Sequence, residues 1–238
     1  MPRRIRRLDD TLVFPPSSEA LDDPNGLLAV GGDLSPARLL AAYKRGIFPW
    51  YEAPQPILWW TPDPRCVLFP EELHLSRSLR RTLRRNAFGL AVDRHFEVVM
   101  RHCARLRGDG RGTWIDDDMV RAYCRLRELG AAHSVEVLAP DGTLAGGLYG
   151  VSLGRVFFGE SMFSRVADAS KVALVALVHI LRHGRFELID CQLPSAHLRS
   201  LGARDIDRLD FEQRLAQTTN LGNRADIWQL PATCGGLL

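Results

Sequence analysis

The sequence predicts a mixed α+β or α/β protein, in which helices cover a β-sheet. The first observation is a strand–helix–strand pattern that runs from Val156 to Gln192. The second is a pair of alternating segments, residues 133–139 and 143–151, joined by a Pro-Asp-Gly turn that is typical of an antiparallel hairpin. With 238 residues, the chain is long enough for one large domain or for a domain with a smaller companion.

The bulk composition is that of an ordinary globular protein with enough apolar residues for a substantial core. The net charge of +3 says little about partners. Lys44 and Lys171 are the only lysines, so arginine carries nearly all of the positive charge. The planar fork of arginine suits phosphate, but a GC-rich genome would explain the same bias. No apolar run is long enough to cross a membrane, and no apolar core follows the basic N-terminus as in a secretory signal.

The N-terminal part of the chain is rich in turns, with one clear helix. Residues 11–34 contain repeated Pro, Gly, Asn and Asp, which favour loops and short strands. Ser35 and Pro36 then suit the start of a helix that Gly46 ends. Residues 47–64 hold three tryptophans and several prolines. They predict either a rigid joint between domains or the aromatic wall of a pocket for a base or an apolar side chain.

A strand over 66–69 precedes an arginine-rich amphipathic helix over 76–85. Its leucines fall on one face, and its arginines share the other, with no acidic residue inside the helix to neutralise them. Like charges at this spacing repel, so a polyanion is a reasonable partner. A solvated face paired with carboxylates from elsewhere is the alternative. The arginines are Arg77, Arg80, Arg81, Arg84 and Arg85.

Further helices and one strand complete the pattern around the hairpin. A strand over 88–92 precedes helices over 95–107 and 116–129. Three aspartates open the second of these, where negative charge is favoured by the helix dipole. Short helices are predicted over 194–201 and 210–218, whereas residues 219–238 show no pattern.

The strand–helix–strand segment places two carboxylates in apolar surroundings. An apolar run from Val156 to Phe158 is broken by Gly159, and a helix over 168–182 leads to a second apolar run over 186–189. Parallel strands joined in this way bring their carboxyl ends together at one edge of the sheet. Glu160 and Asp190 are therefore the first candidates for function, because a buried carboxylate is costly unless it has a partner.

Asp190 and Gln192 are predicted to point the same way, because side chains alternate along a strand, while Cys191 points into packing. A carboxylate beside an amide suits a reaction in which an amine is held and loses a proton. Neither side chain is a strong nucleophile, so direct transfer fits better than a covalent intermediate. A purely structural, hydrogen-bonded role for Asp190 stays open.

Motifs for metal binding or nucleophilic catalysis are incomplete. His179 and His183 stand four apart on a predicted helix, but no third ligand is evident, and the helix dipole also favours histidine there. The five cysteines are scattered, which argues against a disulfide framework or a structural zinc site and fits a reducing cytosol. They are Cys66, Cys103, Cys124, Cys191 and Cys234.

The segment over 159–163 resembles the hydrolase elbow G-x-S-x-G. Phe163, however, stands where the motif needs a second glycine, and its bulk should block the tight turn. Ser161 and Ser164 are therefore predicted as helix caps rather than as nucleophiles.

Several segments together resemble the leucyl/phenylalanyl-tRNA–protein transferase family. They are PNGLLAVGGDLSPARLLAAYKRGIFPWY, PILWWTPDPR, SRSLRR, GTWI, HSVEV, GLYGV, FFGESMFSR, ASKVAL and LIDCQ, in the order of the family and spanning about residues 14–202. The resemblance implies a small N-terminal domain, residues 1–64, and a GNAT-like acyltransferase domain with a mixed sheet, residues 65–238. It also implies transfer of Leu or Phe, less well Met, from aminoacyl-tRNA to proteins with N-terminal Arg or Lys. The product N-terminus marks the protein for degradation.

The resemblance assigns roles to individual residues. Asp190 and Gln192 match the proposed catalytic pair, in which Asp190 draws the proton directly or through Gln192, and Glu160 would hold the cationic acceptor. The five arginines would meet the tRNA backbone by charge rather than by base reading. The adenosine or side-chain pocket would comprise Trp50, Trp114, Leu148, Phe157, Leu177 and Leu181.

The two helix positions Leu177 and Leu181 are aromatic in the family pattern, so the pocket here predicts an altered preference among Leu, Phe and Met. The aminoacyl ester is already activated, so neither a cofactor nor a metal is expected. A monomer in the cytoplasm, without membrane association, is the implied state.

Two other functions are considered beside this one. An acyl-CoA-dependent acetyltransferase would need a Gly-rich pyrophosphate loop before the helix, where this sequence has Glu160 instead. A non-catalytic RNA-binding module would use the arginine helix alone.

Overall fold

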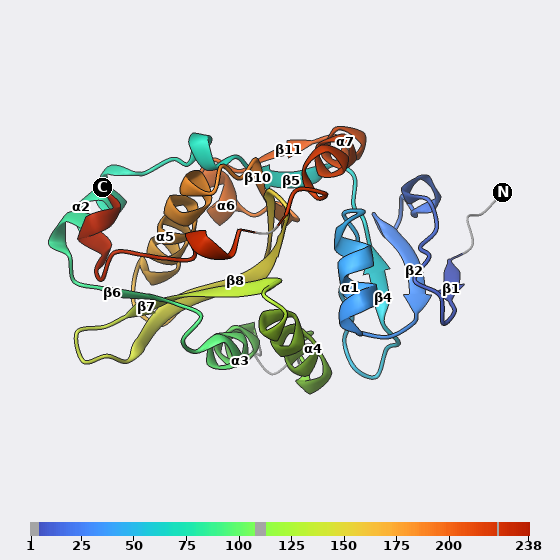
Figure 1. Cartoon of the computed structure of the whole chain (residues 1–238), viewed down its shortest axis with the longest axis horizontal. Helices are drawn as coiled ribbons and strands as arrows, with labels where there is room; N and C mark the ends of the chain where they lie inside the picture. Colours follow the sequence, from blue (N-terminus) through green and yellow to red (C-terminus); the bar gives the residue numbers. More distant parts are fainter. Residues whose placement is uncertain (1–4, 108–112, 223) are drawn as a thin grey trace.

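The computed structural model describes residues 5–107, 113–222 and 224–238 and contains two sheets (Figure 1). The small N-terminal sheet has the strand order β1 (Arg6–Leu8), β2 (Leu27–Gly31), β4 (Leu58–Trp60) and β3 (Phe48–Pro49). The large sheet has seven strands in the order β11 (Arg204–Ile206), β5 (Arg65–Leu68), β10 (Leu188–Gln192), β9 (Val156–Ser164), β8 (Leu144–Leu153), β7 (Ala132–Leu138) and β6 (Gly89–Val92). The predicted α+β class is confirmed.

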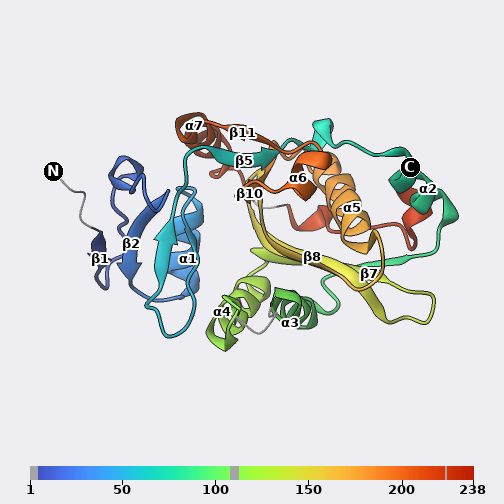
Figure 2. The same ribbon diagram turned by 180° about the vertical axis from the view of Figure 1, so that it is seen from behind.

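Helices cover both faces of the large sheet (Figures 1 and 2). The apolar helix α5 (Ala169–His183) lies on one face, and α3 (Phe96–Arg107) and α4 (Asp117–Glu128) lie on the other. The small sheet carries α1 (Pro36–Tyr43), which packs against α4. One core cluster therefore runs from the small sheet through α1 and α4 into the large sheet. A second cluster lies between α5 and the other face.

The predicted helix starts are confirmed by their caps. The hydroxyl oxygens of Ser35 and Ser76 accept hydrogen bonds from backbone N–H groups at the start of α1 and of α2 (Arg77–Arg85). Asp116 caps α4 in the same way, and Ser195 caps α6 (Ala196–Ser200). These bonds satisfy backbone donors that a helix leaves free at its first turn.

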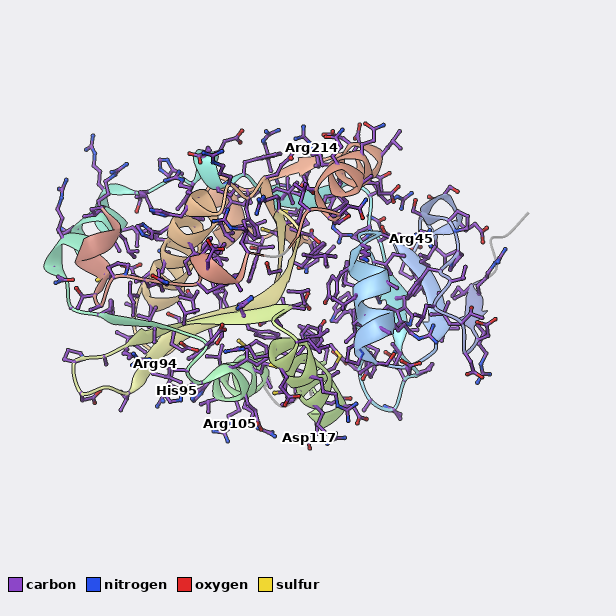
Figure 3. The ribbon with its side chains drawn as sticks, viewed as in Figure 1. Arg45, Arg94, His95, Arg105, Asp117 and Arg214 are labelled. Carbon is purple, nitrogen blue, oxygen red and sulfur yellow. The ribbon has the colours of Figure 1, made fainter. Side chains whose placement is uncertain are left out.

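Arginines tie distant segments to this frame. After α1, the guanidinium of Arg45 donates to the carbonyl oxygens of Phe14 and Pro15 at 2.6 and 2.8 Å, which holds the turn-rich segment (Figure 3). In α7 (Arg208–Thr218), Arg214 donates to Glu187 at 2.6 Å, just before β10. The turn-rich segment is thus fixed to α1, and α7 to the approach of β10.

The hairpin and the parallel pair are observed where the sequence predicts them. Strands β7 and β8 are antiparallel, with Ala132 opposite Val151. Strands β9 and β10 are parallel, with Leu188 opposite Val156 and Asp190 opposite Phe158. The crossover connection between these parallel strands contains α5.

Gly159 does not end β9, contrary to the prediction, because the strand continues to Ser164. The register shifts there: Gly159 lies opposite Gly150 and Ser161 opposite Tyr149, so Glu160 is the extra residue of a bulge. The backbones approach closely at this point, since a Cβ on Gly150 would lie 2.1 Å from the carbonyl oxygen of Phe158. Glu160 therefore lies within a strand rather than at its carboxyl end.

The predicted cap at Ser161 is also wrong, whereas the one at Ser164 is partly confirmed. Ser161 lies inside β9, and Asp168, in left-handed backbone conformation, precedes α5 without a side-chain capping bond. Ser164 does accept a hydrogen bond from the backbone N–H of Ser170 at 3.3 Å, but it does so from the end of the strand.

The C-terminal segment packs on the large sheet although its sequence shows no pattern. Trp228 stacks on His133 of β7, with ring centroids 3.5 Å apart. Thr233 forms a bridge with Gly89 of β6. Within the described ranges, no helix is long and apolar enough to span a membrane.

Candidate functional site

A cavity of about 400 Å³ opens between the small sheet, β8, β9, α5, β10 and α6. Its wall is mostly apolar, and it contains five of the six predicted pocket residues: Trp50, Trp114, Leu148, Phe157 and Leu177. Leu181 is the exception. It lies on nearly the same face of α5 but about 6 Å further along the helix axis, beyond the cavity, and it is fully buried in the core.

The predicted acid Glu160 lines the same cavity and is 8% exposed. Tyr43 of α1 donates to its Oε1 at 2.7 Å, and Tyr123 of α4 donates to its Oε2 at 3.1 Å. The amide Nε2 of Gln192 donates to Oε1 at 3.3 Å. The two tyrosine hydroxyls also contact each other. One carboxyl group thus links α1, α4 and the end of β10.

Burial raises the pKa of Glu160 from 4.5 to about 7. The hydrogen bonds from Tyr43 and Tyr123 lower it, Asp190 raises it and Arg65 lowers it. Desolvation dominates because the charged form loses more hydration than two neutral donors return. A carboxyl group with this pKa exchanges its proton near neutral pH.

Asp190 does not line the cavity and has no exposed surface. The guanidinium of Arg65, on β5, donates from Nε to Oδ1 at 2.8 Å and from Nη2 to Oδ2 at 2.7 Å. The same guanidinium lies over the rings of Phe48 and Phe211. Asp190 is therefore one half of a fully buried, two-bond ion pair, and Arg65 neutralises its charge.

Asp190 and Gln192 do not share one side of an even strand, contrary to the prediction. The register of β10 against β5 shifts between them, because Gln192 lies opposite Cys66 and has a positive φ of 57°. The backbone N–H of Gln192 donates to Asp190 Oδ1 at 3.0 Å. Both Cys191 and Gln192 consequently line the cavity, while Asp190 faces Arg65.

Four residues of this site were not singled out from the sequence. Tyr43 and Tyr123 lie on amphipathic helices, where an aromatic residue reads as core, and Arg65 begins an ordinary apolar strand. His197 of α6 lines the cavity, and burial lowers its pKa. No local signal marks these residues, since only the tertiary fold brings them to Glu160, Asp190 and the cavity.

The predicted arginine helix has the expected two faces. All five arginines of α2 are exposed, and Leu79 and Leu83 are buried. None of the five forms an ion pair with any residue that the structure describes. The alternative of a stripe neutralised from elsewhere in the fold therefore has no support. The helix lies at the end of the molecule opposite the small sheet (Figure 1).

The alternative chemistries lack their geometry. No cluster of three metal-ligating side chains occurs in the described part of the chain, and His183 Nδ1 donates to the carbonyl oxygen of His179 instead. Ser161 lies in an extended strand, and its hydroxyl has no hydrogen-bond partner among the described residues, so no base activates it. Residues 165–168, which lead from β9 into α5, form a bend and a turn without any glycine, so the Gly-rich loop of an acyl-CoA site is not found before this helix.

Comparison with known families gives two adjoining matches. Residues 67–216 match the family model for leucyl/phenylalanyl-tRNA protein transferase, and residues 32–63 match the model for the N-terminal domain of that transferase. A leucyl/phenylalanyl-tRNA–protein transferase of Nitrosospira multiformis is 58% identical over 93% of this chain and 95% of its own length. One from Nitrosomonas europaea is 53% identical over 98% of both chains.

Solved structures of lower similarity cover parts of the chain. An aminoglycoside acetyltransferase from a soil metagenomic sample has a TM-score of 0.38 and 14% identity, over 59% of this chain and 93% of its own. The structure of L-PGS from Bacillus licheniformis has a TM-score of 0.39 and 10% identity, over 66% of this chain and 50% of its own.

The buried ion pair predicts a large stability effect. Asp190→Asn removes the charge that compensates Arg65, so we expect a loss of about 3–5 kcal/mol in the free energy of unfolding. Urea unfolding of the single variants and of Arg65→Gln/Asp190→Asn measures it. The double variant should lose less than the sum of the two singles, and strictly additive losses would contradict the pairing.

Proposed function

The chain belongs to the leucyl/phenylalanyl-tRNA–protein transferase family and is an aminoacyltransferase of that activity, with an aminoacyl-tRNA donor and a protein acceptor; we propose that it transfers Leu or Phe, and Met less well, to the α-amine of proteins that begin with Arg or Lys. The observation that carries the finer proposal is the composition of one cavity. Its wall is apolar along β8 and α5 and ends at a carboxyl and an amide from β9 and β10.

The apolar part suits the transferred side chain. A volume of about 400 Å³ lies within the range of small-ligand sites, and its walls include Leu148, Phe157 and Leu177. Around these three side chains the wall offers no charged group, so a charged side chain of the transferred residue would lose its hydration there without a partner. This supports a preference for Leu, Phe and Met.

The aromatic rim suits the terminal nucleoside of the donor. Trp50 is 38% exposed at the cavity and packs against Trp60, with ring centroids 5.6 Å apart. Trp60 Nε1 donates to the carbonyl oxygen of Trp50 at 2.7 Å, which fixes the pair. Exposed, rigid rings of this kind stack nucleobases without regard to sequence.

The polar end suits an amine acceptor. An α-amine has an unperturbed pKa of about 8, so part of it is free base near neutral pH, and the ester that it attacks is already activated. The protein has to position the amine and relieve it of a proton. In this proposal Gln192 contacts the amine, Asp190 positions Gln192 through its backbone N–H, and the charge of Glu160 attracts the cationic acceptor.

The remaining parts of the proposal concern the whole molecule. We propose domains at residues 1–64 and 65–238, a monomer, and a cytoplasmic site of action in which the product N-terminus marks proteins for degradation. The exposed arginines of α2 would neutralise phosphates of the acceptor stem.

Transfer of radiolabelled Leu from Leu-tRNA to a peptide with N-terminal Arg tests the proposal directly. We expect transfer to this peptide but not to its acetylated form, because acetylation removes the nucleophile. A matched peptide with N-terminal Asp should be a poor acceptor, since its negative side chain is repelled by the negative charge of Glu160. Equal transfer to the Arg and Asp peptides would contradict the proposed preference for acceptors that begin with Arg or Lys.

The shape of the cavity at Leu177 is expected to determine the preference between Leu and Phe as the transferred amino acid. Leu177→Ala should enlarge it and raise kcat/KM for Phe-tRNA relative to Leu-tRNA by roughly 10-fold, the scale set by one or two methylenes. Leu181→Ala is the matched control, because it truncates a leucine on the same helix that is equally buried but does not line the cavity. A similar change of preference in both variants would contradict the assignment of Leu177.

Binding of tRNA should depend on salt through α2. Replacing Arg77, Arg81 and Arg84 with Ala should lower the slope of log K against log salt by about 1 for each phosphate contact that is lost. Arg101→Ala is a control, because this arginine is held by Glu97 and Asp117. Filter-binding titrations at several salt concentrations measure the slope, and an unchanged slope in the triple variant would remove α2 from the interface.

A further inference from the structure

Two buried tyrosines behind the cavity wall form a closed triangle of contacts with Glu160, which has one proton too few when Glu160 is charged. Tyr43 contacts Glu160 Oε1, Tyr123 contacts Oε2, and the two hydroxyls contact each other. Three contacts need three protons, but two tyrosines supply only two. With Glu160 ionised, both hydroxyls donate to the carboxylate, and the contact between the tyrosines holds no proton.

Protonation of Glu160 completes the triangle. A proton on Oε2 donates to Tyr123, Tyr123 donates to Tyr43, and Tyr43 donates to Oε1. Gln192 Nε2, 3.3 Å from Oε1, is a donor in both states and is compatible with either. Burial, together with the charge of Glu160, raises the pKa values of both tyrosines well above 10, so the hydroxyls keep their protons throughout.

Asp190, the other carboxylate near Gln192, is not placed to accept a proton from the acceptor amine. Both oxygens of Asp190 are occupied by Arg65, the residue is fully buried, and it does not line the cavity. Glu160 itself lines the cavity, and its carboxyl group is hydrogen-bonded to the amide of Gln192 there. The proton that leaves the acceptor therefore has a nearer destination than Asp190.

We propose that Glu160 is the base of the transfer reaction and that Tyr43 and Tyr123 are positioning residues that store its proton in a closed ring of hydrogen bonds. This proposal rests on the proposed function. It replaces the prediction that Asp190 draws the proton.

The step balances without any further reagent. The acceptor ammonium gives one proton to the carboxylate of Glu160 and becomes an amine. The lone pair of the nitrogen forms the new C–N bond at the ester carbonyl carbon, and the ester C–O bond breaks. The electron pair leaves with the terminal ribose oxygen of the tRNA, which takes the second proton from nitrogen. Glu160 then returns its proton to water.

The pH dependence follows from the groups that face Glu160. They are Tyr43 of α1, Tyr123 of α4, Arg65 of β5 and Asp190 of β10, and the last two neutralise each other. Burial places the pKa of Glu160 at about 7, and a base has to be ionised to act, so kcat should fall as pH falls through this value. The hydroxyls lower this pKa, so removing either one should move the acidic limb to higher pH.

The test compares pH profiles of kcat, at saturating Leu-tRNA and saturating Arg-initiated peptide, for the wild-type chain and for Tyr43→Phe and Tyr123→Phe. Tyr51→Phe is the matched control, because its hydroxyl bonds Asp116 rather than Glu160. The titration of the peptide amine is common to all four proteins, so a shift confined to the first two variants reports the enzyme. We expect both to move the acidic limb to higher pH.

Glu160→Gln supplies the second readout. It should lower kcat by about 10²–10⁴-fold at saturating peptide, the usual contribution of a general base. A rise in KM with unchanged kcat would mean that Glu160 only attracts the acceptor and would overturn the proposal. Profiles of Tyr43→Phe and Tyr123→Phe that coincide with that of Tyr51→Phe would overturn it as well. Absence of transfer in the wild-type chain with Leu-, Phe- and Met-tRNA would instead refute the proposed function.

Discussion

The ion pair between Arg65 and Asp190 is the constraint on which the site depends. It joins β5 to β10 with two hydrogen bonds in a fully buried setting, where a single charge would be very costly. Asp190 Oδ1 also accepts the backbone N–H of Gln192, which helps to hold that residue in its left-handed conformation. The bulge that results turns the amide of Gln192 toward Glu160. Asp190 thus does not line the cavity itself, but it helps to place the amide of Gln192 in the cavity wall.

The small sheet and its helix α1 contribute side chains to this arrangement. Arg65 lies between Phe48 of β3 and Phe211 of α7, and Tyr43 of α1 reaches Glu160 across the same junction. Both the ion pair and the carboxyl group therefore depend on contacts from the N-terminal sheet. This explains why a cavity whose polar end lies on β9 and β10 also requires residues 36–60 for its rim, at Trp50, and for its hydrogen bonds, at Tyr43.

Local patterns in the sequence predict those features of the fold that depend on neighbouring residues. Ser35, Ser76 and Asp116 are recognisable as caps because a cap acts on the next turn of its own helix. The parallel pair β9–β10 follows from an apolar helix between two apolar runs. Glu160 and Gln192 both line the cavity, but strand periodicity does not predict the backbone that holds them there. The bulges at Glu160 and Gln192 depend on strands β8 and β5, which lie far away in the sequence, so strict alternation gave the wrong direction for Asp190. Tyr43, Tyr123 and Arg65 carry no local signal either, because only the tertiary fold brings them to Glu160 and Asp190.

The ionisation of buried Glu160 lowers the stability of the folded protein. The pKa of Glu160 rises from 4.5 to about 7 on folding, so the folded state binds the proton more tightly than the unfolded chain does. The group is neutral in both states below about pH 4.5, and the folded state then bears no penalty for its charge. Stability is lost as pH rises from there through about 7, and the full difference is on the order of 3 kcal/mol. A glutamine would keep the contact with Tyr43 without this loss. Retaining an ionisable group at such a cost, in a wall that is mostly apolar, fits a residue that has to exchange a proton and does not fit one that merely fills space.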